Sequence, residues 1–298
     1  MADALKRIWL NRKYVMQSAA GGLGGTFAVL GFIALFIPLD GYLKCETLLQ
    51  RIMASILLLG AVCVFWLLIF SVYVLHKHRI TLFSVSDGHN VYVQYGNVLN
   101  KKEVLKPQER RNIVVPVNRC FDTLVDDDLV SANTLHGKTM KKLYAKRYFT
   151  QETLESAIQE SLQGQNLQPE TVPLEEKPKG NRKRYPVGTV AQVSISDTCT
   201  FFFLALSTFD RELHAHTSEE DYVLSLCRLF RFCNVRSQRY PVVMPLIGGG
   251  GSNVWADERE ILEYIVKFLS LNRLLINCDV HIVVRESGRS KVAIADLL

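Results

Sequence analysis

The chain has 298 residues, 48% of them hydrophobic, and carries a formal net charge of +6 at pH 7. Its mean hydropathy of +0.10 is high for a soluble protein of this length, so we expect part of the chain to lie in a membrane. The seven cysteines show neither a CxxC pair nor zinc-ligand spacing. This usage indicates a reducing compartment and excludes a disulfide-stabilised secreted fold.

Two stretches near the amino terminus, residues 14–39 and 52–75, contain no Asp, Glu, Lys or Arg. As helices that rise about 1.5 Å per residue, each is long enough to cross a hydrocarbon core of about 30 Å. The first is too long for the apolar part of a cleaved signal peptide, and the second follows it closely. We therefore predict two transmembrane helices within a membrane anchor, residues 1–79.

Basic residues gather on one side of the two predicted spans. The outer ends are flanked by Lys6, Arg7, Arg12, Lys13, Lys77 and Arg79, whereas the connecting stretch has Lys44 and Arg51 balanced by Asp40 and Glu46. Because Lys and Arg mark the cytoplasmic side, we expect a multi-pass protein of the cell inner membrane with both termini in the cytoplasm. The positive charge is then explained by anchoring, and we expect no nucleic-acid partner.

Small residues form stripes on the first predicted span. Gly21 and Gly25 make a GxxxG pair, and Ala20, Gly24 and Ala28 make a second stripe. Such spacing lets helix backbones approach closely and favours a homo-oligomer, but glycine is also common in membrane helices, and both interpretations stay open. Neither span carries a charge, so a conventional ion pathway is not indicated.

Residues 80–298 are long enough for one cytosolic domain. Apolar, β-branched runs predict strands near residues 80–86, 91–94, 113–117, 190–195, 200–206, 240–246 and 280–284. Helices are predicted near residues 133–148, 150–162, 218–232 and 253–271, the third opened by a capping box from Thr217 to Glu220. This alternation predicts an α/β fold with a mixed, largely parallel sheet flanked by helices. Residues 163–185, which include the basic stretch 177–184, are predicted to be a solvated surface loop.

The segment "VVMPLIGGGGSNVWADEREILEYI" joins a predicted strand to a predicted helix through Gly248, Gly249, Gly250, Gly251 and Ser252. Ser252 or Asn253 is expected to cap the helix. Glycines let the backbone approach a ligand, and a helix start offers free N–H donors to a phosphate. A permissive loop without a ligand is the alternative.

A nucleotide triphosphatase is a second possibility, because "ANTLHGKT", residues 132–139, fits a loose phosphate-loop pattern. The context argues against it. The segment has a single glycine and follows Asp126, Asp127 and Asp128, which would repel a triphosphate.

Three motifs in order resemble those of the macro domain, an ADP-ribose-binding α/β fold. They are "VQYGNVLN" at residues 93–100, "VNRCFDTLVDDDLVSANTLHG" beginning at Val117, and "VVMPLIGGGGSNV" beginning at Val242. The resemblance implies that Asn118 contacts the distal ribose and that the loops around Gly137 and Gly248 close over the diphosphate. The ligand-binding residues it implies are Asn97, Asn118, Asp122, Thr134, His136, Gly137, Gly248, Gly249, Gly250, Gly251, Ser252 and Asn253.

Two positions depart from the family's pattern. Asn97 stands where the family usually has the Asp that binds the adenine amino group, and its amide oxygen can still accept that bond without charge. Phe121 stands where the second Asn of the strand-end motif is expected, which weakens the interpretation as an ADP-ribosyl hydrolase. Asp122 or His136 is the residue that could replace the lost polar group.

Two predicted membrane helices followed by such a domain resemble the membrane-anchored macro-domain effectors of type II Thoeris antiphage defence. The resemblance implies a receptor for an ADP-ribose-derived signal, histidine-ADP-ribose in that family, made from NAD by a TIR-domain partner, with growth arrest through the membrane. We expect no catalytic residue, no metal and no cofactor beyond that ligand. A membrane-anchored ADP-ribosyl hydrolase and a structural membrane adaptor are the alternatives.

Overall fold

The computed structural model describes residues 2–36, 47–106, 108–249 and 257–297. The chain divides into two compact units, Met1–Ile80 with Arg289–Leu298, and Thr81–Gly288. The last ten residues thus belong to the first unit.

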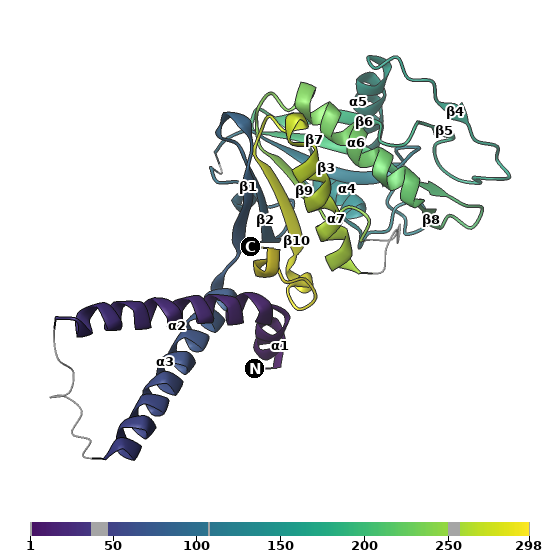
Figure 1. The fold of residues 1–298 in the computed structure, drawn as a ribbon. Helices are drawn as coiled ribbons and strands as arrows, with labels where there is room; N and C mark the ends of the chain where they lie inside the picture. The colour runs from purple at the N-terminus through teal and green to yellow at the C-terminus, as the bar shows by residue number, and fades with distance from the viewer. Residues whose placement is uncertain (1, 37–46, 107, 250–256, 298) are drawn as a thin grey trace. The chain divides into compact units, whose positions relative to one another are not determined.

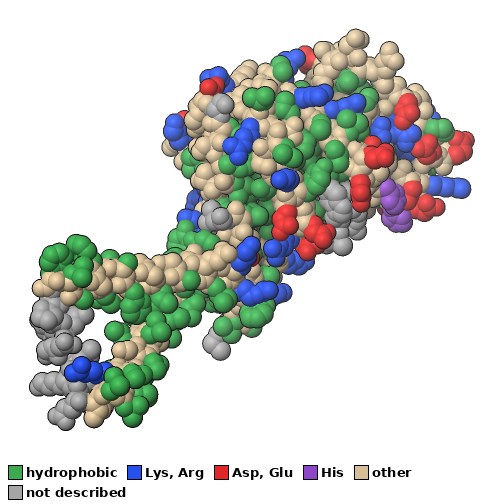
Figure 2. All heavy atoms as spheres, viewed as in Figure 1, with side chains coloured by type: hydrophobic (Ala, Val, Ile, Leu, Met, Phe, Trp, Pro, Cys, Tyr) green, Lys and Arg blue, Asp and Glu red, His purple; other side chains and the backbone are tan. Residues whose placement is uncertain are grey.

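The first unit contains three helices, α1 (Ala2–Leu10), α2 (Arg12–Ala34) and α3 (Leu48–His76). Both predicted apolar helices are confirmed as helices, and each has the length and composition to cross a membrane. In the most apolar 18-residue window, 6% of residues are buried in α2 and none in α3, unlike the core helix of a soluble protein. Figure 2 shows hydrophobic side chains along both helices. The sequence did not predict α1.

Contacts between α2 and α3 leave the glycine stripe uncovered. The Trp66 indole N–H donates to the Thr26 hydroxyl at 2.9 Å, and the ring lies against Gly22. In the described part of the chain, no atom outside the helix backbone lies within 4 Å of where a Cβ of Gly21 or Gly25, or of Gly24 on the second stripe, would stand. The stripe is therefore free for contact with another helix.

The second unit is built on a sheet of order β1-β2-β10-β9-β3-β7-β6, with β8 beside β7. The strands are β1 (Arg79–Ser84), β2 (Asn90–Gly96), β3 (Arg111–Asn118), β6 (Val190–Ser196), β7 (Cys199–Phe209), β8 (Ala215–His216), β9 (Val242–Pro245) and β10 (Val280–Arg285). Strands β2, β10, β9, β3 and β7 pair in parallel, and β6 pairs antiparallel with β7. The predicted mixed, largely parallel sheet is confirmed.

Helices flank this sheet (Figure 1). They are α4 (Leu135–Ala145), α5 (Gln151–Gln163), α6 (Glu219–Arg236) and α7 (Glu258–Leu271), with short 3-10 turns η2 (Ser86–Gly88), η3 (Lys101–Glu103), η4 (Arg273–Leu275) and η5 (Glu286–Gly288). The turn η6 (Ala295–Leu297) belongs to the first unit. Successive side chains of β7 point to opposite faces of the sheet, so this strand contributes to the core on both faces. Phe201 and Phe203 stack in the cluster that contains α4 and α5, whereas Phe202 packs edge-on against Phe232 of α6.

Two predicted helix caps are wrong. Helix α6 is capped by Ser218, whose hydroxyl accepts from the Asp221 N–H, and not by Thr217. Helix α7 begins at Glu258 with Asp257 as its N-cap, later than the predicted cap at residues 252–253. The tertiary structure therefore selects one of several adjacent residues that are all able to cap.

The segment 163–185 is also more than a surface loop. It contains the paired strands β4 (Glu170–Thr171) and β5 (Lys183–Arg184). Val172 and Lys177 are each only 2% exposed. The expectation that the basic stretch 177–184 is solvated is thus wrong for its first residue, whose buried partner is described below.

Candidate functional site

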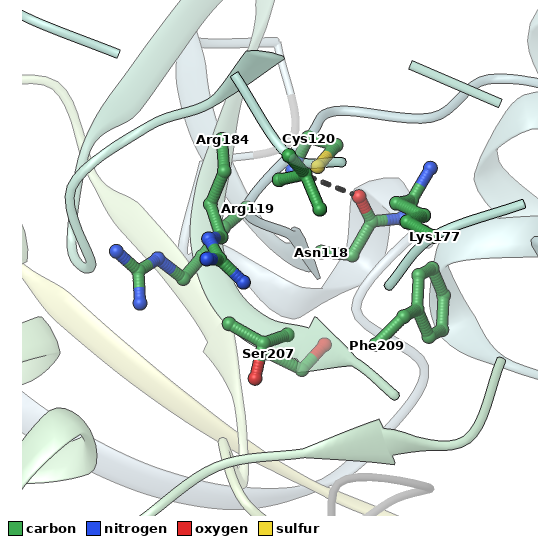
Figure 3. A pocket seen from close by; sticks show the side chains of 9 residues that line it. Asn118, Arg119, Cys120, Lys177, Arg184, Ser207 and Phe209 are labelled. Carbon is green, nitrogen blue, oxygen red and sulfur yellow. Dashed lines mark hydrogen bonds between the residues drawn. The ribbon is translucent and has the colours of Figure 1, made fainter. Parts of the chain in front are cut away.

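The candidate site lies where parallel strands β3 and β7 end. Asn118 is the last residue of β3, and a register shift at Val117 and Asn118 places it opposite Ser207. A small pocket of about 10 Å³, room for roughly one water molecule, opens beside it. Figure 3 shows its lining residues, which are Asn118, Arg119, Cys120, Val172, Lys177, Arg184, Ser207, Thr208 and Phe209.

In the Asn118 side-chain amide, the oxygen is hydrogen-bonded and the nitrogen is not. Its side-chain Oδ1 accepts hydrogen bonds from the backbone N–H groups of Cys120, at 3.0 Å, and Asp122, at 3.4 Å (dashed for Cys120 in Figure 3). These bonds fix the amide orientation and leave Nδ2, which is buried, without a partner. Because a buried N–H without an acceptor costs free energy, Nδ2 is a donor set up for a ligand oxygen.

Phe121 points into the core. Its side chain is 2% exposed and packs edge-on against Tyr185 with the ring centroids 5.5 Å apart. Its φ of 53° lies in the left-handed region, which is uncommon for an aromatic residue and forms a tight turn after β3. The turn places an apolar anchor where a polar residue was expected from the resemblance.

A buried ion pair between Lys177 and Asp122 stabilises this turn. The Lys177 Nζ lies 2.9 Å from the Asp122 Oδ2, and both side chains are 2% exposed. Lys177 also donates to the backbone carbonyls of Lys179, at 2.7 Å, and Asn181, at 2.8 Å, while the Asn181 N–H donates to the Asp122 Oδ1 at 2.6 Å. Burial raises the pKa of Asp122, and Lys177 opposes that rise. Asp122 is thus engaged internally; its direct contact with a ligand stays a prediction.

Two more exposed ion pairs, both made by Lys179, also join segment 163–185 to the loop that follows β3. Lys179 Nζ lies 2.6 Å from the Asp126 carboxylate and 2.7 Å from that of Asp128. The acidic run that argued against a triphosphate is therefore partly neutralised within the domain. These ion pairs help to hold segment 163–185 against the loop that follows β3.

Positive charge also borders the pocket. The Arg119 Nε donates to the Tyr185 carbonyl at 2.8 Å. Arg184 pairs with Glu170 and Glu176. Together with Lys177, these arginines were missed in the sequence analysis; the position of Arg119 directly after Asn118 was the available signal.

Thr134, His136 and Gly137 lie at the start of α4. The Thr134 hydroxyl caps the helix by accepting from the Gly137 N–H at 3.0 Å. A Cβ on Gly137 would lie 2.2 Å from the Ser131 carbonyl oxygen, so only glycine permits this approach of helix and loop. The Gly137 N–H is thus committed to the helix cap, so this donor is not available to a phosphate.

His136 is buried, and its imidazole hydrogen-bonds to the Asp122 backbone carbonyl. The nitrogen in that bond must carry the proton, which makes Nε2 an acceptor, and Nε2 has no partner. Burial lowers the pKa of His136 to about 4. Among the described residues, Asn118 and His136, which both hydrogen-bond to the Asp122 backbone, thus offer one unpartnered donor and one unpartnered acceptor.

The pKa of His136 predicts acid sensitivity. The pKa in the folded protein is about 4, against the ordinary histidine pKa of about 6.5, so between these values the unfolded chain binds more protons and stability falls as pH is lowered. At about 1.4 kcal/mol per pKa unit, the full loss is roughly 3 kcal/mol. We expect His136→Gln to flatten the pH dependence of the unfolding free energy in urea between pH 6.5 and 4.5. Equal slopes in the variant and the wild type would contradict a neutral buried imidazole.

Gly248, Gly249 and Asn97 follow strands that end at the same edge of the sheet. Gly248 and Gly249 follow β9, which pairs with β3, so their loop and the one after Asn118 are neighbours. Gly248 has a φ of 96°, which favours glycine, whereas a Cβ on Gly249 would make only ordinary contacts at 3.5 Å. Gly250, Gly251, Ser252 and Asn253 lie outside the described residues.

Asn97 follows β2, three strands from β3, or about 14 Å at the usual strand spacing. It is exposed, and its Oδ1 accepts from the Leu99 N–H at 3.0 Å. An oxygen has a second lone pair, so the predicted adenine contact is still possible. Among described residues, no group of three His, Cys, Asp or Glu side chains is arranged to hold a metal ion.

The sheet order, the asparagine at the end of β3 and the glycine loop after β9 define an α/β domain of macro type. The chain belongs to the family of the Thoeris protein ThsA macro domain, whose model matches residues 91–285. A curated relative, Thoeris protein ThsA of Bacillus amyloliquefaciens (strain Y2), is 26% identical over 215 residues, which cover 72% of this chain and 64% of the relative. The chain thus spans less than two thirds of that protein's length.

Solved macrodomains of Oceanobacillus iheyensis are also similar. An asparagine-to-alanine variant is 14% identical, with a TM-score of 0.41 over 72% of this chain and 90% of that chain. The same macrodomain with ADP is 13% identical, with a TM-score of 0.35 over 72% of this chain and 93% of that chain. These likenesses are remote and do not bear on which ligand this chain binds.

Proposed function

We propose that this protein is a membrane-bound receptor of Thoeris antiphage defence that binds an ADP-ribose-derived signal. The observation that carries the proposal is the buried, unpartnered Asn118 Nδ2 at the end of β3, in a domain of the ThsA macro family. A ribose hydroxyl can accept from this donor. The adjacent glycine loop and Arg119, which directly follows Asn118, suit a diphosphate.

The signal is proposed to be a conjugate such as histidine-ADP-ribose, made by a TIR-domain protein. The His136 Nε2 supports a hydroxyl-bearing ligand, because it can accept the proton of the same or a neighbouring hydroxyl. One donor and one acceptor, both desolvated, would discriminate against a ligand without hydroxyls.

Binding without turnover fits the site better than hydrolysis. A general base must accept a proton near neutral pH. Asp122 is committed to Lys177, and His136, with a pKa of about 4, is a weak base. Phe121 adds no polar group.

The test is incubation of the purified protein with the ADP-ribose conjugate and with ADP-ribosylated protein, followed by quantification of released ADP-ribose. We expect stoichiometric binding and both substrates recovered intact. Many turnovers per chain, abolished by Asn118→Ala, would establish the hydrolase instead.

We also propose that binding acts through clustering of the helices in the membrane, leading to growth arrest. The exposed stripe of Gly21, Gly24 and Gly25 supports this, since it is open in the single chain and suits close approach of a second copy. A ligand shifts such an equilibrium only by its differential affinity for the clustered form.

Gly21→Ile and Gly25→Ile should therefore prevent the ligand-dependent increase in oligomer size and should also prevent the arrest of cell growth. Their affinity for the ligand should be unchanged. Gly60→Ile, on α3 and also without an atom within 4 Å of its Cβ position, is the matched control and should behave as wild type. Oligomer size in bilayers and colony counts with the signal present are the readouts. Normal clustering by both stripe variants would place the contact elsewhere.

A further inference from the structure

A short helix at the start of the chain presents an exposed apolar face. Helix α1 (Ala2–Leu10) directly precedes α2, and Figure 1 shows the two as separate helices. Its buried and half-buried residues recur at i, i+3, i+4 and i+7 and are Ala4, Arg7, Ile8 and Asn11. Leu5 and Trp9, one turn apart on the opposite side, are 61% and 67% exposed. Two large apolar side chains therefore lie next to each other on the outer side of α1.

Arg7 holds α1 at one end of the second candidate span. Its Nη2 donates to the Leu75 backbone carbonyl at 2.6 Å. Leu75 is next to the last residue of α3, where a helix leaves carbonyls without intrahelical partners, so Arg7 satisfies one of them. Helix α2 follows α1 at once, and its uncharged stretch begins at Tyr14. Helix α1 therefore lies beside the ends of both candidate spans, at the side that carries Lys77 and Arg79.

Basic side chains accompany the apolar face. Lys6, Arg12 and Lys13 are exposed, and within the described ranges none of them forms an ion pair. The Arg12 guanidinium lies over the Trp9 ring, 4.7 Å from the ring centroid, and its Nη1 donates to the Trp9 carbonyl at 3.2 Å. The outer surface of α1 and the start of α2 thus combines apolar and positively charged side chains.

This combination suits the surface of an anionic bilayer better than water or a second copy of the chain. Trp and Leu together with Lys or Arg are typical of helices that lie in the membrane interface. Basic side chains are attracted to anionic headgroups, whereas the same face of a second copy would bring like charges together. Because α1 is tethered beside the two spans, even a weak affinity for lipid is enough to keep it bound.

We propose that α1 is an interfacial helix that inserts Leu5 and Trp9 into the headgroup region of an anionic bilayer, with Lys6, Arg12 and Lys13 bound to lipid phosphates. The inference rests on the membrane location in the proposed function and is independent of the ADP-ribose-derived ligand. Lipid binding by α1 would fix the depth at which the two spans end.

The test uses Trp9 as the probe in the full-length protein. The chain has three tryptophans, so Trp255→Phe leaves Trp9 and Trp66, and adding Trp9→Phe gives the Trp9 emission by difference. The proteins are reconstituted in vesicles of phosphatidylcholine, with or without phosphatidylglycerol, whose acyl chains carry bromine close to the headgroup. Bromine quenches a ring that contacts the lipid. Trp9 emission should be quenched in the anionic vesicles and clearly less in phosphatidylcholine alone.

Charge removal tests the basic residues. Lys6→Gln, Arg12→Gln and Lys13→Gln together should lower the quenching of Trp9 in anionic vesicles by about half or more. The control removes three charges from exposed lysines of the other unit, by Lys101→Gln, Lys138→Gln and Lys141→Gln. Quenching of Trp9 in this control should match that in the wild type.

Trp66 lies in α3 and reports separately on the span. Its emission, measured with Trp9→Phe and Trp255→Phe, should be quenched in both kinds of vesicle by bromine placed deeper in the acyl chains. Quenched Trp66 with unquenched Trp9 would overturn this inference alone, whether water or a second copy covers the Trp9 ring. Equal quenching of Trp9 in both vesicles, or in the three-charge variant and its control, would also overturn it. Unquenched Trp66 would overturn the membrane location and this inference with it.

Discussion

Lys177→Met is expected to destabilise the protein by about 3–5 kcal/mol, the usual cost of removing one partner from a buried ion pair. The Asp122 carboxylate would remain 2% exposed without its counter-charge. The carbonyls of Lys179 and Asn181 would lose their shared donor at the same time. The measurement is the free energy of unfolding in urea at pH 7, followed by a signal from the macro-type domain.

Two comparisons isolate the cause. Lys177→Met combined with Asp122→Asn removes both charges but keeps an oxygen for the Asn181 N–H, and should recover most of the lost stability. Lys179→Met removes a more exposed ion pair from the same segment and should have a much smaller effect. A single Lys177→Met variant as stable as wild type would show that the pair does not hold the two segments together.

Gly137→Ala is expected to lower affinity for the ADP-ribose-derived ligand by at least tenfold and to destabilise the fold by about 2 kcal/mol, in the range for overpacking. The added Cβ would meet the Ser131 carbonyl oxygen at 2.2 Å. Backbone must therefore move, and the loop between Asn118 and α4 is the part able to shift. Calorimetric titration and urea unfolding measure the two effects.

Gly164→Ala is the matched control. Gly164 caps α5 with a φ of −71°, a value open to any residue, and no atom lies within 4 Å of the Cβ position. This variant should bind normally and be as stable as wild type or slightly more stable. Normal binding by Gly137→Ala would mean that the loop accommodates the change and that its position does not determine affinity.

Much of the fold was accessible from the sequence because its elements have strong patterns. Each of the seven predicted strands is present, since β-branched runs such as that of β3 are buried on both faces. The apolar spans were equally clear. Cap positions were not, because Thr217 and Ser218 are both good N-caps and the choice depends on how α6 docks.

The candidate site was only partly predictable. Asn118 and the glycines after β9 follow from strand ends in a parallel sheet. The burial of Lys177 has no sequence signal, since it depends on a 23-residue segment, residues 163–185, folding back on the loop after β3. Local composition predicted that Lys177 is solvated, because the Lys, Pro and Gly residues around it are typical of solvated loops.

The inward turn of Phe121 was likewise beyond pattern reasoning. A motif alignment places the residue at a ligand-facing position, but its left-handed φ of 53° rotates the side chain into the core against Tyr185. Backbone conformation at a single non-glycine residue thus decides which side chain faces the pocket. Asn118 is left as the polar group of that turn.

Calorimetric titration of the full-length protein with ADP-ribose, its histidine conjugate and ATP tests the central claim most directly. The account predicts saturable binding of the ADP-ribose derivatives and much weaker binding of ATP. It further predicts at least tenfold weaker binding by Asn118→Ala, and by Gly249→Val, whose Cβ position has only ordinary 3.5 Å contacts in the free protein. Wild-type affinity in both folded variants, or no binding of any ADP-ribose derivative, would contradict it.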